Sequence, residues 1–128
     1  MHKILIVDDE YAILKILKTY LSKKGFEVIS AQGGEKAIEI LHSDIKADFA
    51  IIDMKMPKVK GIDVVQEMKK VNMQIPFIIL SGSLGIEECE KEIANLGFSN
   101  FRYLMKPIDL DQLLDTIKKM QNPGSKEQ

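Results

Sequence analysis

The sequence has no tryptophan, a single cysteine and almost no net charge. With one cysteine no disulfide can form within the chain, so packing must stabilise the fold, and a reducing, cytoplasmic location is expected. Acidic residues flank Cys89 and disfavour a thiolate, which indicates a structural role. The 18 basic and 19 acidic residues give a formal net charge of −1, so we expect binding neither to nucleic acid nor to an anionic membrane.

Long hydrophobic runs are also absent. The N-terminal apolar run, residues 4–7, is too short for the core of a signal peptide, and no stretch approaches the length of a membrane span. The 128 residues, 45% hydrophobic and 29% charged, are typical of one globular domain. Residues 122–128 are polar and turn-forming, which predicts a domain of residues 1–121 followed by a tail or the start of a linker.

Five short segments predict β-strands. Three are apolar without polar alternation, as expected of strands buried on both faces of a parallel sheet: residues 4–7, 49–52 and 77–80. Two weaker candidates are residues 27–30 and 101–105.

Apolar residues at helical spacing lie between these segments and predict five helices. The apolar stripes are Ile13, Leu14, Leu17 and Leu21; Ala37, Ile38 and Leu41; Ile62, Val65 and Met68; Ile86, Ile93 and Leu96; and Leu110, Leu113, Leu114 and Ile117. Gly25 and Gly97 follow the first and fourth helices as stop signals, and Asp109 is placed to cap the last helix. Five strands alternating with five helices predict a doubly wound parallel α/β fold with right-handed crossovers.

Polar side chains follow four of the predicted strands. These residues are Asp8, Asp9 and Glu10 after the first strand, Asp53 after the third, Ser81 after the fourth and Lys106 after the fifth. In a doubly wound sheet, ligands bind at the carboxyl edge, near the point where the strand order reverses. The sequence therefore predicts that these groups converge on one edge.

Each of these residues also has a simpler interpretation. Asp8 and Asp9 could cap the helix that begins near Tyr11, because Asp is favoured at helix starts. Asp53 could be a loop acid, Ser81 a turn hydroxyl and Lys106 a surface lysine. A shared site is favoured because four separate strand ends would otherwise have to carry compatible groups by chance.

The chemistry of such a cluster predicts a cation and a phosphoryl group. Three neighbouring carboxylates repel one another and cannot all stay ionised without a cation. A set of oxygen ligands without histidine suits Mg²⁺, which shares its coordination with phosphoryl oxygens. Lys106 and Ser81 could contact the remaining phosphoryl oxygens. Transfer to a carboxylate gives a mixed anhydride that hydrolyses readily, which suits a transient mark.

The motifs resemble those of a known family. From Lys3 to about Met120, the segments ILIVDDE, IIDMKMP followed by Gly61, IILSG and YLMKP resemble the receiver domain of two-component response regulators. The resemblance implies a flavodoxin-like sheet with strand order 2-1-3-4-5. It also implies a signalling switch that receives its phosphoryl group from a sensor histidine kinase or a histidine phosphotransfer protein. A downstream output domain or protein would then respond.

The resemblance implies roles for the acidic residues. Asp53 corresponds to the phosphoryl acceptor. Asp9 corresponds to a direct Mg²⁺ ligand and Asp8 to a ligand through water, with the backbone carbonyl of Lys55 as a further ligand. The protein would catalyse its own phosphorylation and slow dephosphorylation, and it would not be a metabolic enzyme.

The resemblance also implies a switch. Lys106 corresponds to the lysine that contacts the phosphoryl group, and Ser81 to the hydroxyl that moves toward it. Tyr103 corresponds to the aromatic residue that turns inward in response; the alternative is an aromatic side chain that simply packs on the fourth helix. The face formed by the fourth helix, the last strand and the last helix would change. Gly82 stands where the family usually has alanine, and Ile108 where an aromatic residue is common.

Glu10 and Lys55 suggest a further hypothesis. We expect them to form an ion pair across the mouth of the site and to hinder the water that would hydrolyse the acyl phosphate. The alternative is that Lys55 is a solvated surface lysine, because exposed ion pairs contribute little.

Two other functions remain possible at this point. A haloacid dehalogenase-like phosphatase also combines aspartate, Mg²⁺, a hydroxyl and lysine, but its nucleophile usually ends the first strand in an Asp-x-Asp arrangement. A binding module could keep the fold and respond to something other than phosphate. The complete set of Asp8, Asp9, Asp53, Ser81 and Lys106 argues against the second alternative.

Overall fold

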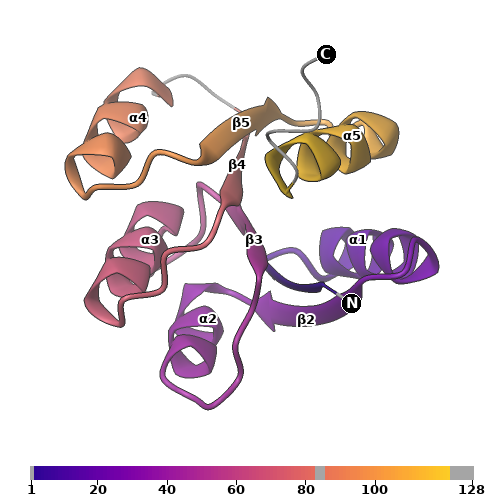
Figure 1. Cartoon of the computed structure of the whole chain (residues 1–128), viewed down its shortest axis with the longest axis horizontal. Coiled ribbons are helices and arrows are strands. Elements are labelled where there is room, and N and C mark those ends of the chain that lie inside the picture. Colours follow the sequence, from indigo (N-terminus) through magenta and orange to yellow (C-terminus); the bar gives the residue numbers. More distant parts are fainter. Residues whose placement is uncertain (1, 83–85, 122–128) are drawn as a thin grey trace.

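The structure is a computed structural model that describes residues 2–82 and 86–121. Strands and helices alternate along the chain (Figure 1): β1 (Lys3–Asp8), α1 (Tyr11–Lys23), β2 (Glu27–Gln32), α2 (Gly34–Leu41), β3 (Phe49–Asp53), α3 (Gly61–Lys70), β4 (Phe77–Ser81), α4 (Ile86–Asn95), β5 (Phe101–Met105) and α5 (Leu110–Gln121). The five strands pair in parallel in the order β2-β1-β3-β4-β5. The predicted α/β fold and strand order are confirmed.

The sheet lies between two layers of helices. Figure 1 shows α1 and α5 on one face of the sheet and α2, α3 and α4 on the other. Alternate side chains of the central strands enter the two layers: Ile4 and Ile6 pack in the cluster of α1 and α5, and Leu5 and Val7 pack in the cluster of α2 and α3. Because both faces of these strands are buried, they need apolar residues at every position. Burying each large apolar side chain stabilises the fold by roughly 1.5 to 3 kcal/mol.

Local signals at the helix ends act as predicted. The backbone N–H of Gln112 donates a hydrogen bond to Oδ1 of Asp109 at 3.1 Å, so Asp109 caps α5. Gly25 and Gly97 follow α1 and α4 with φ of 96° and 97°, a left-handed conformation that glycine adopts without a steric penalty.

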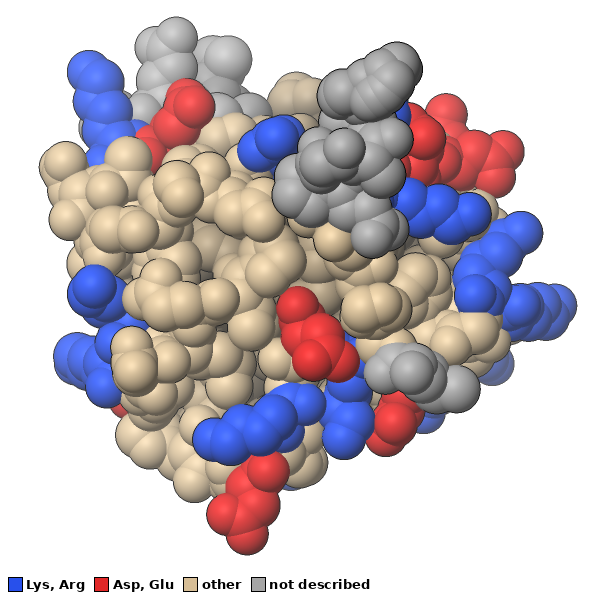
Figure 2. All heavy atoms as spheres, in the orientation of Figure 1, with Lys and Arg blue, Asp and Glu red and all other residues tan. Residues whose placement is uncertain are grey.

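The surface is mixed in charge. On the face shown in Figure 2, basic and acidic side chains are interspersed around the periphery and uncharged residues cover most of the centre. Among the described helices, none has the length and apolar character needed to cross a membrane. The last helix ends at Gln121, and the predicted tail, residues 122–128, lies outside the described residues.

Candidate functional site

Three strands end in the polar residues that the sequence singled out. Asp8 is the last residue of β1, Asp53 of β3 and Ser81 of β4, so parallel pairing brings them to one edge of the sheet. Carboxylate oxygens of Asp8, Asp9 and Asp53 lie within 4.8 Å of one another. Asp8 is fully buried and Asp53 is 4% exposed. The predicted acidic cluster therefore forms in the structure.

Lys106 joins this cluster from the segment after β5. Its Nζ lies 3.1 Å from Oδ1 of Asp53, 3.3 Å from Oδ2 of Asp8 and 3.7 Å from Oε1 of Glu10. The backbone N–H of Lys106 donates a hydrogen bond to the carbonyl of Ser81 at 2.8 Å, which fixes the lysine next to the end of β4. A single ammonium group thus faces three carboxylates.

The site perturbs the pKa values of its groups. Burial, followed by the charge of Asp8, raises the pKa of Asp53 from 3.8 to about 6, although Lys106 opposes the shift. Burial also raises the pKa of Asp8, against the opposing effects of the Glu10 N–H and Lys106. For Lys106 burial alone lowers the pKa, but Asp53 and Asp8 outweigh it, so the net shift is upward. The raised pKa of Lys106 keeps its ammonium group charged. The raised pKa values of Asp8 and Asp53 indicate that this one positive charge does not fully offset the burial of the two carboxylates.

The residues present suit a hard divalent cation. The cluster offers carboxylate oxygens and no sulfur or nitrogen ligand among the described residues, and one lysine does not balance three carboxylates. A hollow of about 390 Å³ opens above the cluster and is lined by Asp9, Glu10, Asp53, Lys55, Gly82 and Lys106. It offers room for a small charged group beside the buried oxygens of Asp53. These donors fit Mg²⁺ better than a softer metal.

Two further residues belong to this edge of the sheet or lie near it. Ser81 is buried and directly follows Leu80, which pairs with Asp53 in the sheet. Tyr103 on β5 packs against the cluster that contains Cys89 and Ile93 of α4. Its hydroxyl is buried and makes no hydrogen bond of good geometry among the described residues, although the thiol of Cys89 is near enough to interact with it. Burial, followed by the charge of Cys89, raises the pKa of Tyr103. Tyr103 therefore packs on the fourth helix, and its role as a switch stays a prediction.

Comparison with known proteins decides the family. A sequence model described as the response regulator receiver domain matches residues 4–118 of the chain. The chain belongs to the receiver domain family. Because the match spans both Asp8 and Lys106, the haloacid dehalogenase-like alternative is set aside.

Individual relatives agree with this assignment. Sporulation initiation phosphotransferase F of Bacillus subtilis is 34% identical over 119 residues, which are 91% of this chain and 91% of that protein. Response regulator SaeR of Staphylococcus aureus is 43% identical over 81 residues. That match covers 63% of this chain and 35% of SaeR, so it involves about a third of the longer protein.

Solved structures share the receiver fold. A response regulator receiver domain protein from Clostridium thermocellum is 32% identical and has a TM-score of 0.83 over 96% of each chain. A CheY-like receiver domain protein from Methanospirillum hungatei JF-1 is 27% identical, also with a TM-score of 0.83, over 97% of this chain and 99% of that one. The receiver fold therefore extends over nearly the whole chain.

Two interpretations of the acidic loop of this receiver domain need revision. Oδ1 of Asp8 accepts a hydrogen bond from the Glu10 N–H at 2.9 Å, and the start of α1 has no side-chain cap, so Asp8 and Asp9 do not cap that helix. The predicted ion pair between Glu10 and Lys55 is wrong. Among the described residues, Glu10 pairs with Lys106 at 3.7 Å, whose ammonium group also contacts Asp8 and Asp53, and Lys55 forms no ion pair.

Sequence reasoning missed how closely Gly61 of the receiver domain approaches the acceptor. A Cβ atom at Gly61 would lie 2.5 Å from the carbonyl oxygen of Asp53 and 2.9 Å from Cα of Met54. The N–H of Gly61 donates to the carbonyl of Met54 at 3.1 Å. The start of α3 therefore packs directly on the backbone that positions Asp53. A glycine directly before a predicted helix, where Ser, Thr, Asp or Asn is favoured as a cap, was the available signal.

Proposed function

We propose that this receiver domain accepts a phosphoryl group on Asp53. A carboxylate oxygen of Asp53 attacks phosphorus while the bond between phosphorus and the donor histidine nitrogen breaks, and the nitrogen keeps the electron pair. The product is an aspartyl phosphate, a mixed anhydride. The observation that carries the proposal is the position of Asp53: it ends β3, is almost fully buried, and has an oxygen 3.1 Å from Lys106.

Asp8, Asp9, Asp53 and the backbone carbonyl of Lys55 would hold Mg²⁺. When bound, this cation neutralises negative charge on the carboxylates and on phosphoryl oxygens. The mutual distances of the three carboxylates and the raised pKa values of Asp8 and Asp53 support this assignment, because the metal-free cluster is short of positive charge. Gly61 approaches the backbone of Asp53 and Met54 closely, so α3 packs against the two residues that precede Lys55.

Lys106 would neutralise a phosphoryl oxygen on the side facing β5. In the present arrangement its ammonium group already contacts Asp53 and Asp8. When a phosphoryl oxygen replaces one of these contacts, the ammonium group stays paired with a negative charge. Lys106 therefore stabilises the negative charge of the phosphoryl group as that group approaches Asp53. Lys106 is therefore a positioning and charge-stabilising group, and Asp53 is the nucleophile.

Phosphorylation would act as a switch through Ser81 and Tyr103. Ser81 sits at the end of β4, and Tyr103 lies on the adjacent strand β5 between the sheet and α4. A hydroxyl drawn toward the phosphoryl group would change the space available to Tyr103 and bias the face made by α4, β5 and α5. A downstream protein or output domain would read that face.

The phosphoryl donor would dock on the α1 side of the site. Ile13, Ile16 and Leu17 of α1 lie beside Pro107 and Ile108, around a hollow of about 250 Å³ that reaches Lys106. Ile16 is 54% exposed, which is unusual for a large apolar side chain. This apolar patch next to Lys106 suits a helix of a histidine kinase or of a phosphotransfer protein, whose histidine would then face Asp53.

A small phosphodonor tests the assignment of Asp53. Wild type and Asp53→Asn are incubated with acetyl phosphate and Mg²⁺, and intact mass is recorded over time. We expect the wild type to gain the mass of one phosphoryl group and Asp53→Asn to gain none. Asp44→Asn, which removes an exposed carboxylate from a loop, serves as the matched control and should be labelled like the wild type. Equal labelling of Asp53→Asn, or labelling that persists in the presence of a chelator, would reject the proposal.

A further inference from the structure

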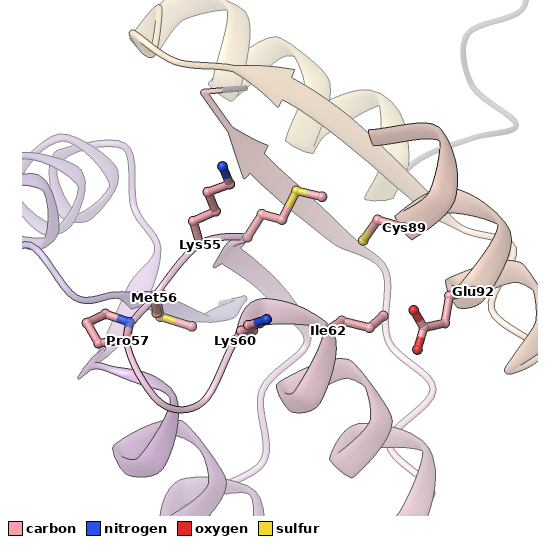
Figure 3. A pocket seen from close by; sticks show the side chains of 8 residues that line it. Lys55, Met56, Pro57, Lys60, Ile62, Cys89 and Glu92 are labelled. Carbon is pink, nitrogen blue, oxygen red and sulfur yellow. The ribbon is translucent and has the colours of Figure 1, made fainter. Parts of the chain in front are cut away.

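A second cavity lies beside the phosphoryl site, between the segment that links β3 to α3 and the start of α4 (Figure 3). Its volume is about 620 Å³, and its lining residues are Met54, Lys55, Met56, Pro57, Lys60, Ile62, Cys89 and Glu92. Among the described residues, Lys55 alone is shared with the lining of the acidic hollow above Asp53. The two spaces are therefore neighbours with different chemistry.

The walls of this cavity are mainly apolar. Met56 and Pro57 lie on the segment between β3 and α3, Ile62 lies at the start of α3 and Cys89 lies on α4. Met54 completes the apolar part of the lining. Methionine side chains are flexible and polarisable, so they adapt to ligands of different shape. Pockets that hold small organic molecules usually measure roughly 300 to 1,000 Å³ and are lined mostly by apolar side chains. Size and lining both fit a small organic ligand.

The charges around the cavity favour an anion. Lys55 and Lys60 lie on the β3–α3 side, and neither forms an ion pair with an acid among the described residues. Among the described side chains, Glu92 is the one acid in the lining, and it lies on the α4 side (Figure 3). Its Oε2 accepts a hydrogen bond from the side-chain amide of Gln66 at 3.0 Å. The lysines are thus available to a ligand, and Glu92 is held away from them.

We propose that this cavity binds a small amphipathic anion, an aromatic or short aliphatic body that carries one carboxylate or sulfonate. The apolar body packs against Met54, Met56 and Ile62, and the anionic group pairs with Lys60. Binding does not require phosphorylation. Because Met54 follows Asp53 directly and Lys55 borders both spaces, an occupant contacts the same segment that positions the phosphoryl acceptor.

Cys89 supplies a direct reporter of occupancy. It is the only cysteine of the chain, it is 8% exposed, and it lines this cavity. A thiol reagent that reaches Cys89 from this cavity needs the space that the ligand would fill. The alkylation rate, followed by intact mass, therefore measures whether the cavity is occupied.

The test uses 8-anilinonaphthalene-1-sulfonate, an apolar fluorophore with one sulfonate. We expect saturable binding at one site, with a fluorescence increase on titration into the metal-free wild type. Lys60→Glu should weaken the affinity by about tenfold, the loss expected when a charge-assisted contact becomes repulsive. Lys58→Glu changes the same charge in the same loop but outside the lining, and should stay within about twofold of the wild type.

Three further measurements make the outcome decisive. Saturating fluorophore should slow the alkylation of Cys89 by N-ethylmaleimide. Lys60→Gln removes the charge without reversing it, so its affinity for the fluorophore should lie between those of the wild type and Lys60→Glu. Asp53→Asn should bind like the wild type, so failure of phosphorylation and failure of this proposal are separable. Equal weakening in Lys60→Glu and Lys58→Glu, or an alkylation rate unaffected by saturating fluorophore, would overturn the assignment.

Discussion

The Nζ atom of Lys106 lies 3.1 Å from Oδ1 of Asp53 and connects the segment after β5 to the end of β3, across the intervening strand β4. The contact spans two strand spacings, so it forms only when the sheet has its correct order and register. It places a positive charge beside the carboxylate of Asp53, whose pKa is raised to about 6. Lys106 thereby opposes the effect of burial and keeps a larger fraction of Asp53 ionised near neutral pH.

Lys106→Gln should slow phosphorylation. The substitution keeps a side chain of similar length and removes the charge that faces Asp53 and Asp8. We expect the rate of labelling by acetyl phosphate in Mg²⁺ to fall by roughly 100-fold, the usual cost of removing one preorganised electrostatic contact. Lys23→Gln, at the end of α1, is the matched control and should label at the wild-type rate. A Lys106→Gln rate close to that of the wild type would exclude a role for the ammonium group.

The buried carboxylate of Asp53 should make folding stability depend on pH in the absence of metal. Its pKa is about 6 in the folded protein against 3.8 for the free group, so the folded state binds the proton more tightly than the unfolded state. Ionisation of Asp53 therefore destabilises the folded state. This loss of unfolding free energy is absent below about pH 4, grows as pH rises between the two pKa values, and is complete above about pH 7. Asp53→Asn should remove it.

Urea unfolding in the presence of a chelator measures this effect. At about pH 7, Asp53→Asn should be more stable than the wild type by about 1 to 3 kcal/mol, and the difference should shrink at about pH 4.5. Adding Mg²⁺ should stabilise the wild type more than the variant, because only the wild type has the complete carboxylate set. A difference that is independent of pH would show that ionisation of Asp53 is not its source.

Gly61 and Gly82 should respond differently to alanine. The Cβ of Gly61→Ala would meet backbone atoms of Asp53 and Met54 at 2.5 and 2.9 Å, so α3 or the acceptor must shift. We expect a loss of about 1 to 3 kcal/mol in unfolding free energy and a lower labelling rate of Asp53. Among the described residues, the Cβ of Gly82→Ala would meet Cβ of Lys106 at 3.8 Å, an ordinary contact. Its unfolding free energy should stay the same or rise by up to about 1 kcal/mol.

The buried hydroxyl of Tyr103 should contribute little stability. Among the described residues it makes no hydrogen bond of good geometry, and the thiol of Cys89 that interacts with it is a weak partner, so its burial is poorly compensated. Tyr103→Phe should therefore unfold at the same or a higher urea concentration than the wild type, by up to about 1 kcal/mol. Tyr103→Ala should lose about 3 kcal/mol, because the ring packs against Phe101 and the α4 cluster. A loss above about 1 kcal/mol in Tyr103→Phe would show that the hydroxyl is hydrogen-bonded in solution.

The composition and periodicity of the sequence were sufficient for the element order, the parallel sheet and the edge at which the polar residues meet. Unbroken apolar strands such as residues 49–52 are compatible only with burial on both faces, and each parallel strand ends at the same edge. The sequence therefore predicted that Asp8, Asp53 and Ser81 are neighbours, because each comes directly after the apolar run of its strand. The strand order came from the family resemblance, since local patterns do not encode which strands pair.

Tertiary structure decided which groups touch. Glu10 pairs with Lys106, and Lys55 lies at the boundary between the two hollows. The pair of Glu10 and Lys106 forms only because the two side chains meet across the ends of β3 and β4. Gly61 is required because the start of α3 packs against the backbone of Asp53. These contacts join residues far apart in the chain, and their energies depend on distance and burial, which no local pattern of residue types specifies.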